Sequence, residues 1–152
     1  MASEWYHQEL AIVGTVDPTA ATTAATVYTD AVDMDVFEKA IFIVTVNEIS
    51  ANTTLVLTLH SDTAATASGM TVACATSTAL SGTADSNKQV WLEVDTEDMD
   101  PDLRHRYVSG EVVIGGTGGT IDHYGVVVLG GRCRYHPASN YDLTTVDSIG
   151  NS

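Results

Sequence analysis

The sequence predicts an all-β domain, built as an antiparallel β-sandwich or jelly roll of about eight strands with an extended N-terminal arm. Three observations predict it. Several segments are rich in β-branched and aromatic residues and are bounded by Gly, Pro, Asn, Asp or Ser. Some of them alternate between apolar and polar residues, and no segment of eleven or more residues holds a helical period apart from a turn near 95–103. A closed barrel is the alternative.

The expected strands follow one another at short intervals with no βαβ alternation, which favours antiparallel pairing. In Thr54–His60, Leu55, Leu57 and Leu59 share one face, as in a half-buried strand. In Lys88–Asp95, Val90, Leu92 and Val94 point one way, and Trp91 points the other. In chain order the expected strands are the weaker Glu9–Val13 and Val27–Val32, then Glu38–Asn47 and Thr53–His60, the weaker Met70–Ala75, then Lys88–Asp95, His105–Ile114 and His123–Tyr135.

The chain divides into an arm, residues 1–26, and a sandwich domain, residues 27–152. The arm is too apolar for a solvated tail, so we expect it to pack on this domain or on a neighbouring subunit. The Thr- and Ala-rich stretches 18–26 and 61–84 predict long loops or extended segments at the rim. Gly115–Thr120 predicts a flexible hairpin between two adjacent strands.

Composition excludes several classes of protein. The chain has 20 acidic and 6 basic side chains, a net charge of −14, which would repel the phosphates of nucleic acid. Its apolar runs, such as 40–46 and 126–129, are shorter than the ~20 residues of a membrane-spanning helix. The N-terminus has no basic and apolar signal regions, so we expect a soluble protein made in a cytoplasm. Cys74 and Cys133 predict free, buried thiols.

No motif predicts a cofactor, a metal ion or catalysis. Asp98, Asp100 and Asp102 have the spacing of a calcium loop, but Leu103 and Ser109 stand where such a loop needs Gly and Glu. The histidines have no ligand spacing, and no serine lies in a nucleophile elbow. We therefore expect no enzyme. A triad assembled by convergence, and a metal shared between subunits, are alternatives that leave no signature in one sequence.

Four of the six basic residues form two i, i+2 pairs, Arg104 with Arg106 and Arg132 with Arg134. On a strand each pair would project from one face, with Cys133 on the other. In so acidic a chain, ion pairing with nearby carboxylates is the simpler interpretation. The alternative hypothesis is a protein interface, because Arg and Tyr often anchor one. The candidate interface residues are Arg132, Arg134, Tyr135 and His136, together with Trp5, Tyr6, His7, Leu10 and Ile12 of the arm.

Four stretches of the chain resemble small virion proteins of tailed bacteriophages that are encoded beside the major capsid protein. They are Trp5–Thr15 (WYHQELAIVGT), Phe37–Val44 (FEKAIFIV), Arg106–Val108 (RYV) and Arg134–Leu143 (RYHPASNYDL). The resemblance runs along nearly the whole chain and rests on general sequence character. It implies a jelly-roll decoration, or cement, protein on the outer surface of the capsid.

The resemblance also implies partners and an assembly. We expect this protein to bind the major capsid protein and itself, as a homotrimer, and to cement adjacent capsid subunits. The arm could add a strand to a neighbour's sheet edge. A neck, tail or fibre-associated virion protein that binds host-surface carbohydrate is the alternative, although only Trp5 and Trp91 are available as tryptophans for sugar binding.

Overall fold

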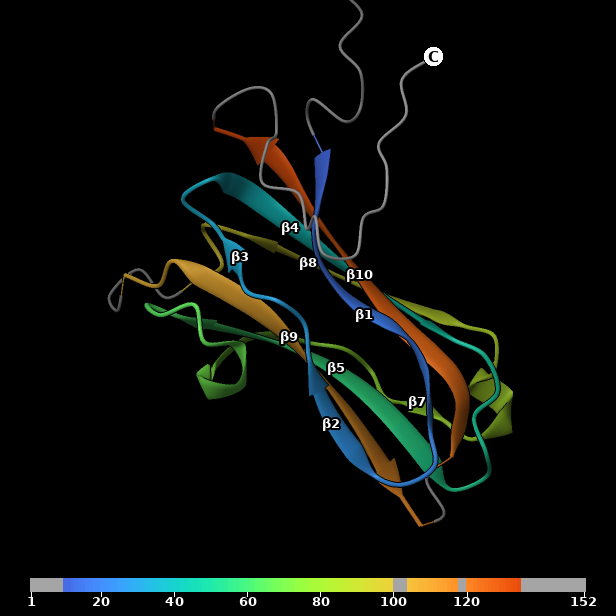
Figure 1. Ribbon diagram of the computed structural model, residues 1–152. Helices are drawn as coiled ribbons and strands as arrows, with labels where there is room; N and C mark the ends of the chain where they lie inside the picture. Colours follow the sequence, from blue (N-terminus) through green and yellow to red (C-terminus); the bar gives the residue numbers. More distant parts are fainter. Residues whose placement is uncertain (1–9, 100–103, 118–119, 135–152) are drawn as a thin grey trace, which may run out of the picture.

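The computed structural model describes residues 10–99, 104–117 and 120–134, and two antiparallel sheets pack there as a β-sandwich (Figure 1). The predicted fold class is therefore confirmed. Sheet A has the order β1-β10-β4-β8, with bounds Leu10–Ala21, Ile121–Cys133, Phe37–Val46 and Gln89–Asp95. Sheet B has the order β2-β9-β5-β6, with bounds Ala25–Tyr28, Tyr107–Gly116, Thr53–Asp62 and Val72–Thr76. Two short strands complete sheet B, β3 (Val32–Asp33) beside β9 and β7 (Leu80–Ser81) beside β5.

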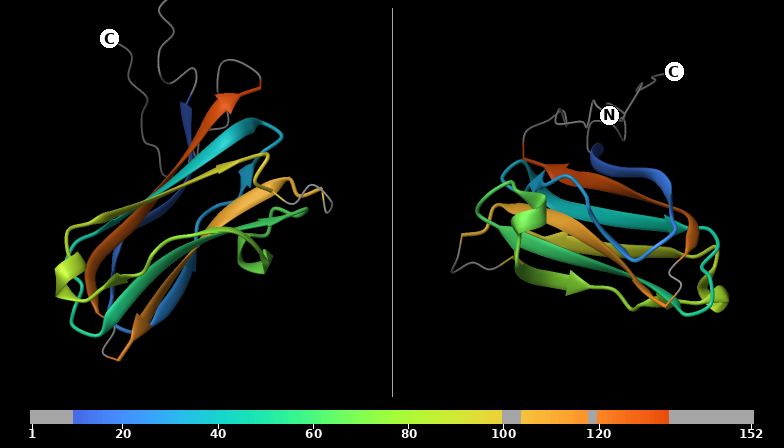
Figure 2. Two further views of the ribbon diagram at one scale, coloured as in Figure 1. Left: turned by 180° about the vertical axis from the view of Figure 1, so that it is seen from behind. Right: turned by 60° about the horizontal axis from the view of Figure 1, so that its bottom comes forward.

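The strands form a jelly roll. Because β2 and β3 both pair with β9, and β6 and β7 both pair with β5, the ten strands fill eight positions. In chain order, the first position pairs with the eighth, the second with the seventh, the third with the sixth and the fourth with the fifth. This is the pairing of one long antiparallel hairpin folded over into two sheets, as in jelly rolls. The two layers are seen in both views of Figure 2.

The core lies between the sheets and follows the alternation of the strands. Leu55, Leu57 and Leu59 of β5 are fully buried, as the sequence predicts, and Val90 and Val94 of β8 are buried with them. Side chains of β4, β9 and β10 complete the core, among them Phe42, Val44, Val112, Ile114, Val126 and Val128. Burying one side chain of this kind contributes about 1.5–3 kcal/mol. The inward face of each strand is therefore apolar, and function is left to the outward faces, the edges and the connections.

Three further expectations concern the arm, the stretch 61–84 and membrane-spanning helices. Residues 10–26 of the predicted arm form β1 and the first part of β2, and residues 1–9 lie outside the described residues. The stretch 61–84 contains β6, β7 and the 3-10 turns η1 (Ala67–Gly69) and η2 (Thr83–Asp85). No helix among the residues described is long and apolar enough to cross a membrane.

One expectation about a connection is wrong. Gly115–Thr120 was expected to join two adjacent strands, but β9 lies in sheet B and β10 in sheet A. The connection therefore crosses from one sheet to the other. The reason is that β9 pairs with β5 and β2, and β10 pairs with β4 and β1, so the partners of each strand are far away in the sequence.

Candidate functional site

The outward side of sheet A presents apolar side chains from all four of its strands. The pairing places Ile12, Leu129 and Ile41 side by side in one row across the sheet. The next row holds Val127, Ile43 and Trp91. Trp91 is 63% exposed and Val127 39% exposed, and the other four are half-buried. We call these six residues the apolar face.

The outward side of sheet B has a different chemistry, which shows that strand formation does not require the apolar face. There the central pairs of β5 and β9 are Thr58 with Glu111 and His60 with Ser109. Thr favours strands as Val and Ile do, so a solvated sheet can use it without exposing apolar area. Of the outward pairs of β5 and β9, only Val56 with Val113 consists of two aliphatic side chains. An apolar patch on one outward face of a sandwich marks an interaction surface.

Carboxylates flank the apolar face. Glu93 of β8 lies in the row of Ile41, and Asp95 lies opposite Lys39 in the next outward row. The ammonium group of Lys39 lies 2.7 Å from Glu93 and 3.2 Å from Asp95. The hydrogen bond from Lys39 to Glu93 raises the pKa of Lys39, and the hydrogen bond to Asp95 raises it further. Asp17 is exposed beside the other end of the face. The charge around the face is therefore negative overall, so a complementary partner surface brings cations to its rim.

A groove lies beside the apolar face at Gly125. Its apolar part, about 320 Å³, is lined by residues that include Ile12, Val127 and Pro18. Pro18 and Gly125 also line a neighbouring hollow of about 300 Å³, whose other residues are mostly polar, among them Asn47, Asn87, Lys88, Gln89 and His123. A Cβ atom at Gly125 would lie 3.3 Å from the carbonyl oxygen of Val16, so glycine keeps the floor of the groove open.

Four of the predicted interface residues lie in the described part of the chain. Leu10 and Ile12 are half-buried in β1 and pair with Gly131 and Leu129. Arg132 and Arg134 are exposed at the end of β10. Trp5, Tyr6, His7, Tyr135 and His136 lie outside the described residues. Because β1 begins where β10 ends, the structure brings the Leu10 end of the arm and the Arg132 end of β10 together.

Two of the four arginines, Arg106 and Arg132, form ion pairs of the kind that the acidic composition favours. The Nε atom of Arg132 lies 3.4 Å from Glu38, and Arg106 forms hydrogen bonds with Asp33 through two nitrogens, with Nε 2.8 Å from Oδ1. Hydrogen bonding to Asp33 raises the pKa of Arg106, and hydrogen bonding to Arg106 lowers the pKa of Asp33. Arg134 donates its backbone N–H to Val36. Cys133 is buried and Arg132 and Arg134 are exposed, but the two arginines are not a regular strand pair, because β10 ends at Cys133 and Arg132 has a φ of 51°.

Sequence reasoning did not identify Ile41, Ile43, Val127 and Leu129 as site residues. Their signal is present, because residues 40–44 and 126–129 are apolar without interruption. An uninterrupted apolar strand places apolar side chains on both of its faces. Such a run is typical of a strand buried on both sides, and here one side is open to solvent.

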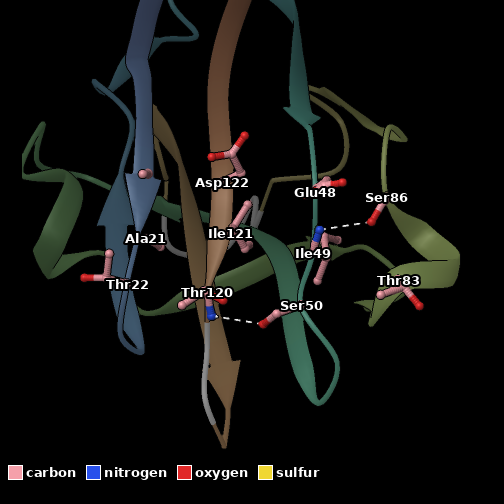
Figure 3. Close-up of a pocket in the computed structure, with 11 residues that line it drawn as sticks. Ala21, Thr22, Glu48, Ile49, Ser50, Thr83, Ser86, Thr120, Ile121 and Asp122 are labelled. Atoms are coloured by element: carbon pink, nitrogen blue, oxygen red, sulfur yellow. Dashed lines mark hydrogen bonds between the residues drawn. The ribbon is translucent and has the colours of Figure 1, made fainter.

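A cavity of about 500 Å³ lies at one end of the sandwich (Figure 3). Small and hydroxyl-bearing side chains line it, together with Glu48 and Asp122. Two of its hydroxyls bind backbone: Ser86 accepts the N–H of Ile49 at 3.0 Å, and Ser50 accepts that of Thr120 at 3.3 Å. Among the described residues, no histidine or cysteine lines this cavity.

Two further observations concern chemistry. Ser61 and His105 form a hydroxyl–imidazole pair at 2.8 Å, but Ser61 is fully buried, which closes its hydroxyl to a substrate. Within residues 10–99, 104–117 and 120–134, no group of three His, Cys, Asp or Glu side chains could hold a metal ion. The features of the described surface that suit binding are the apolar face, the groove beside it and the carboxylates that flank it.

Comparison with known proteins adds two structures. No family model matches the sequence, and no curated protein matches it. The fold is similar to chains in solved structures of infectious bursal disease virus, from the Gx strain (TM-score 0.46, 12% identity) and the Gt strain (TM-score 0.45, 11% identity). Each similarity covers 85% of this chain and 33% of the other, so this chain spans about a third of their length.

Proposed function

We propose that this protein is a structural virion protein that binds the outside of a tailed-phage head and cements adjacent major capsid protein subunits. The observation that carries the proposal is the apolar face, which leaves six apolar side chains outward on one sheet of an otherwise acidic sandwich. Solvation does not require such a face, but docking on another protein does. A protein that holds neighbouring subunits together needs a surface of this kind.

The charge supports the same location. A net charge of −14 disfavours contact with packaged nucleic acid and is compatible with the exterior of the shell. The described lysines, Lys39 and Lys88, are paired with carboxylates, and so are Arg106 and Arg132. The excess charge on the surface is therefore negative, which favours a partner with a basic rim.

The proposal includes an assembly. The four stretches that resemble phage virion proteins support the major capsid protein as partner, and the resemblance supports a homotrimer. Oligomers of this kind are symmetric, so they match local symmetry axes of a shell.

The copy number of the protein in purified virions tests the proposal. We expect quantitative mass spectrometry to give a ratio to the major capsid protein near one, or a simple fraction set by the symmetry axes of the shell. Purified protein added to heads that lack it should restore this ratio. Only a few copies in each particle would contradict the proposal and move the protein to the neck or tail, and its absence from virions would end it.

One observation favours the alternative of carbohydrate binding at a host surface. Trp91 is 63% exposed between the outward side chains of Gln89 and Glu93 on β8. An exposed indole beside polar groups is the arrangement that stacking on a sugar needs. If the alternative holds, Trp91→Ala abolishes adsorption to host cell-wall polysaccharide and leaves incorporation of the protein into virions unchanged.

A further inference from the structure

Three of the four sheet edges in the described structure are irregular. In β1 the pairing shifts between Ile12 and Gly14 and again between Val16 and Thr19. The edge formed by β2 and β3 is interrupted after Tyr28, and the edge formed by β6 and β7 is interrupted after Thr76. Interruptions of this kind protect an edge from pairing with another chain. The fourth edge, β8, pairs with β4 over seven consecutive residues with no shift.

The hydrogen bonds fix which backbone groups of β8 point to the open side. The N–H of Val46 donates to the backbone carbonyl of Lys88 at one end of the β4–β8 ladder. At the other end, the N–H of Thr96 donates to the backbone carbonyl of Glu38. Hydrogen-bonded pairs alternate along an antiparallel ladder. Even-numbered residues of β8 therefore bind β4, and odd-numbered residues direct their N–H and C=O groups away from it.

One end of this open edge is closed by the chain itself. The carboxylate of Asp98 accepts the N–H of Asp95 at 3.0 Å, and the N–H of Asp98 donates to the carbonyl of Asp95 at 3.0 Å. Gln89, Trp91 and Glu93 remain, and no described residue forms a hydrogen bond with their outward backbone groups. Their side chains lie on the same side as the apolar face.

We propose that the β8 edge binds an extended segment of the partner protein as an added antiparallel strand. The segment has an apolar side chain opposite Trp91 and a Lys or Arg opposite Glu93. Backbone hydrogen bonds to Gln89, Trp91 and Glu93 give affinity, and the alternate side chains give specificity. The added strand extends the apolar face by one strand beyond Trp91.

Charge selects the kind of segment. Glu93 is 54% exposed, and its one described cation partner, Lys39, is shared with Asp95. An opposite charge directly across a strand pair is stabilising and a like charge is destabilising. Residues 1–9 of this chain contain Glu4 and Glu9 and no Lys or Arg, so another protein fits this edge better than a second copy does. That this protein is the phage shell rests on the proposed function, whereas the open edge does not.

The test uses the full chain and a nine-residue peptide whose third, fifth and seventh residues are lysine, valine and lysine and whose other residues are threonine. We expect the peptide to shift the fluorescence of Trp91 and to protect the amides of Trp91 and Glu93 from hydrogen exchange. Glu93→Pro should weaken binding about tenfold relative to Glu93→Ala, because both variants lose the charge but only Pro loses the outward N–H. Equal affinity of the two variants would overturn the proposal.

Two controls separate pairing from folding. Proline is tolerated at an edge position whose N–H faces outward, so Glu93→Pro should keep the melting temperature, whereas Leu92→Pro removes a donor to β4 and should lower it. If Glu93→Pro is itself unstable, the peptide carries the test instead. N-methylation of the peptide residues whose backbone N–H groups point toward β8 should abolish binding. N-methylation of the residues whose N–H groups point away from β8 should preserve it. Equal binding of the two methylated peptides would overturn the proposal.

The same variants separate this inference from the proposed function. If Glu93→Pro decorates heads as the parent does, while the parent is present at capsid stoichiometry, the edge is not the contact and the proposed function stands. If the peptide results follow the edge but the protein is absent from virions, the proposed function fails and the strand-binding edge remains.

Discussion

At the scale of single residues, two hydroxyl side chains continue the ladders of sheet B where its outer strands are interrupted. Thr29 donates its N–H to the carbonyl of Gly110, and its Oγ1 accepts the N–H of Gly110, both at 2.9 Å. Ser77 does the same with Leu57, at 2.8 Å and 3.0 Å. Each side-chain oxygen stands in for a backbone carbonyl. The partner strands β9 and β5 therefore keep their backbone groups satisfied opposite a break.

Replacing the first of these hydroxyls tests its contribution. Thr29→Val keeps the shape of the side chain but leaves the buried N–H of Gly110 without an acceptor. We expect the free energy of unfolding to fall by about 1–3 kcal/mol. Thr29→Ser should restore most of it, and Thr26→Val, at an exposed position of β2, should change it by less than about 0.5 kcal/mol. Chemical denaturation measures all three, and equal values for Thr29→Val and Thr26→Val would contradict the role of the hydroxyl.

The ion pair of Asp33 and Arg106 gives a pH dependence. Hydrogen bonding to Arg106 lowers the pKa of Asp33 from its ordinary value of 3.8. Because the folded state binds this proton less readily than the unfolded state, the pair stabilises the fold above pH 3.8, and this contribution is lost as the pH falls through the lowered pKa. Asp33→Asn should therefore be less stable than the parent at pH 7, and the difference should shrink at acidic pH.

A neighbouring carboxylate provides the control for this pair. Asp35 lies 3.2 Å from the Nε atom of Arg106 but is 63% exposed, so Asp35→Asn should cost less at pH 7 than Asp33→Asn. Thermal unfolding between pH 2 and pH 7 measures both variants. A difference between Asp33→Asn and the parent that stays constant over this range would show that the ion pair does not contribute.

At the scale of elements, the sequence predicted most strands but not the path between them. Thr54–His60 and Lys88–Asp95 show their alternation locally, so their inward faces could be assigned correctly. The pair β6 and β7 could not be resolved, because its interruption depends on Ser77 meeting Leu57 across the sheet. The crossing after Gly115 could not be predicted either, since local turn preferences do not indicate which sheet the next strand joins.

The first strand separates folding from assembly in a deletion experiment. Deleting residues 1–15 should abolish attachment to heads if the arm is an anchor, but it also removes half of β1. We expect the melting temperature to fall by at least about 10 °C, as the loss of several kcal/mol does in a domain of this size. Deleting residues 1–9 leaves β1 whole and should change the melting temperature by less than about 2 °C.

Binding then decides the role of the arm. Attachment of the protein that lacks residues 1–9 to undecorated heads is measured by sedimentation. Loss of attachment with an unchanged melting temperature would support an anchoring arm. Retained attachment would contradict it and leave the apolar face and the β8 edge as the contacts.

At the scale of the whole molecule, the candidate site becomes visible only when the strands are placed side by side. Ile12, Ile43 and Trp91 are far apart in the sequence and meet because β10 and β4 lie between β1 and β8. Leu10, Ile12, Arg132 and Arg134 could be nominated from local composition. The apolar face could not be predicted in this way, because an apolar run does not indicate which of its two sides the other sheet covers.

The two outward faces allow a matched test of the proposed function. Val127 on sheet A and Val113 on sheet B are 39% and 37% exposed, and both lie on central strands. Val127→Glu should weaken attachment to heads at least about tenfold, because it places a charge in an apolar contact. Val113→Glu adds the same charge on the other face and should bind as the parent does. Equal losses would show that net charge, not the apolar face, governs attachment.

The pairing of β1 with β10 has a consequence for synthesis on the ribosome. β1 is made first, but its partner β10 is among the last parts of the described chain to be translated. The inward side of sheet A therefore stays incomplete and exposed until β10 has been translated. A nascent chain in this state is open to chaperones and proteases. The net charge of −14 acts on the chain before it is folded, since mutual repulsion keeps unfinished copies apart on the polysome.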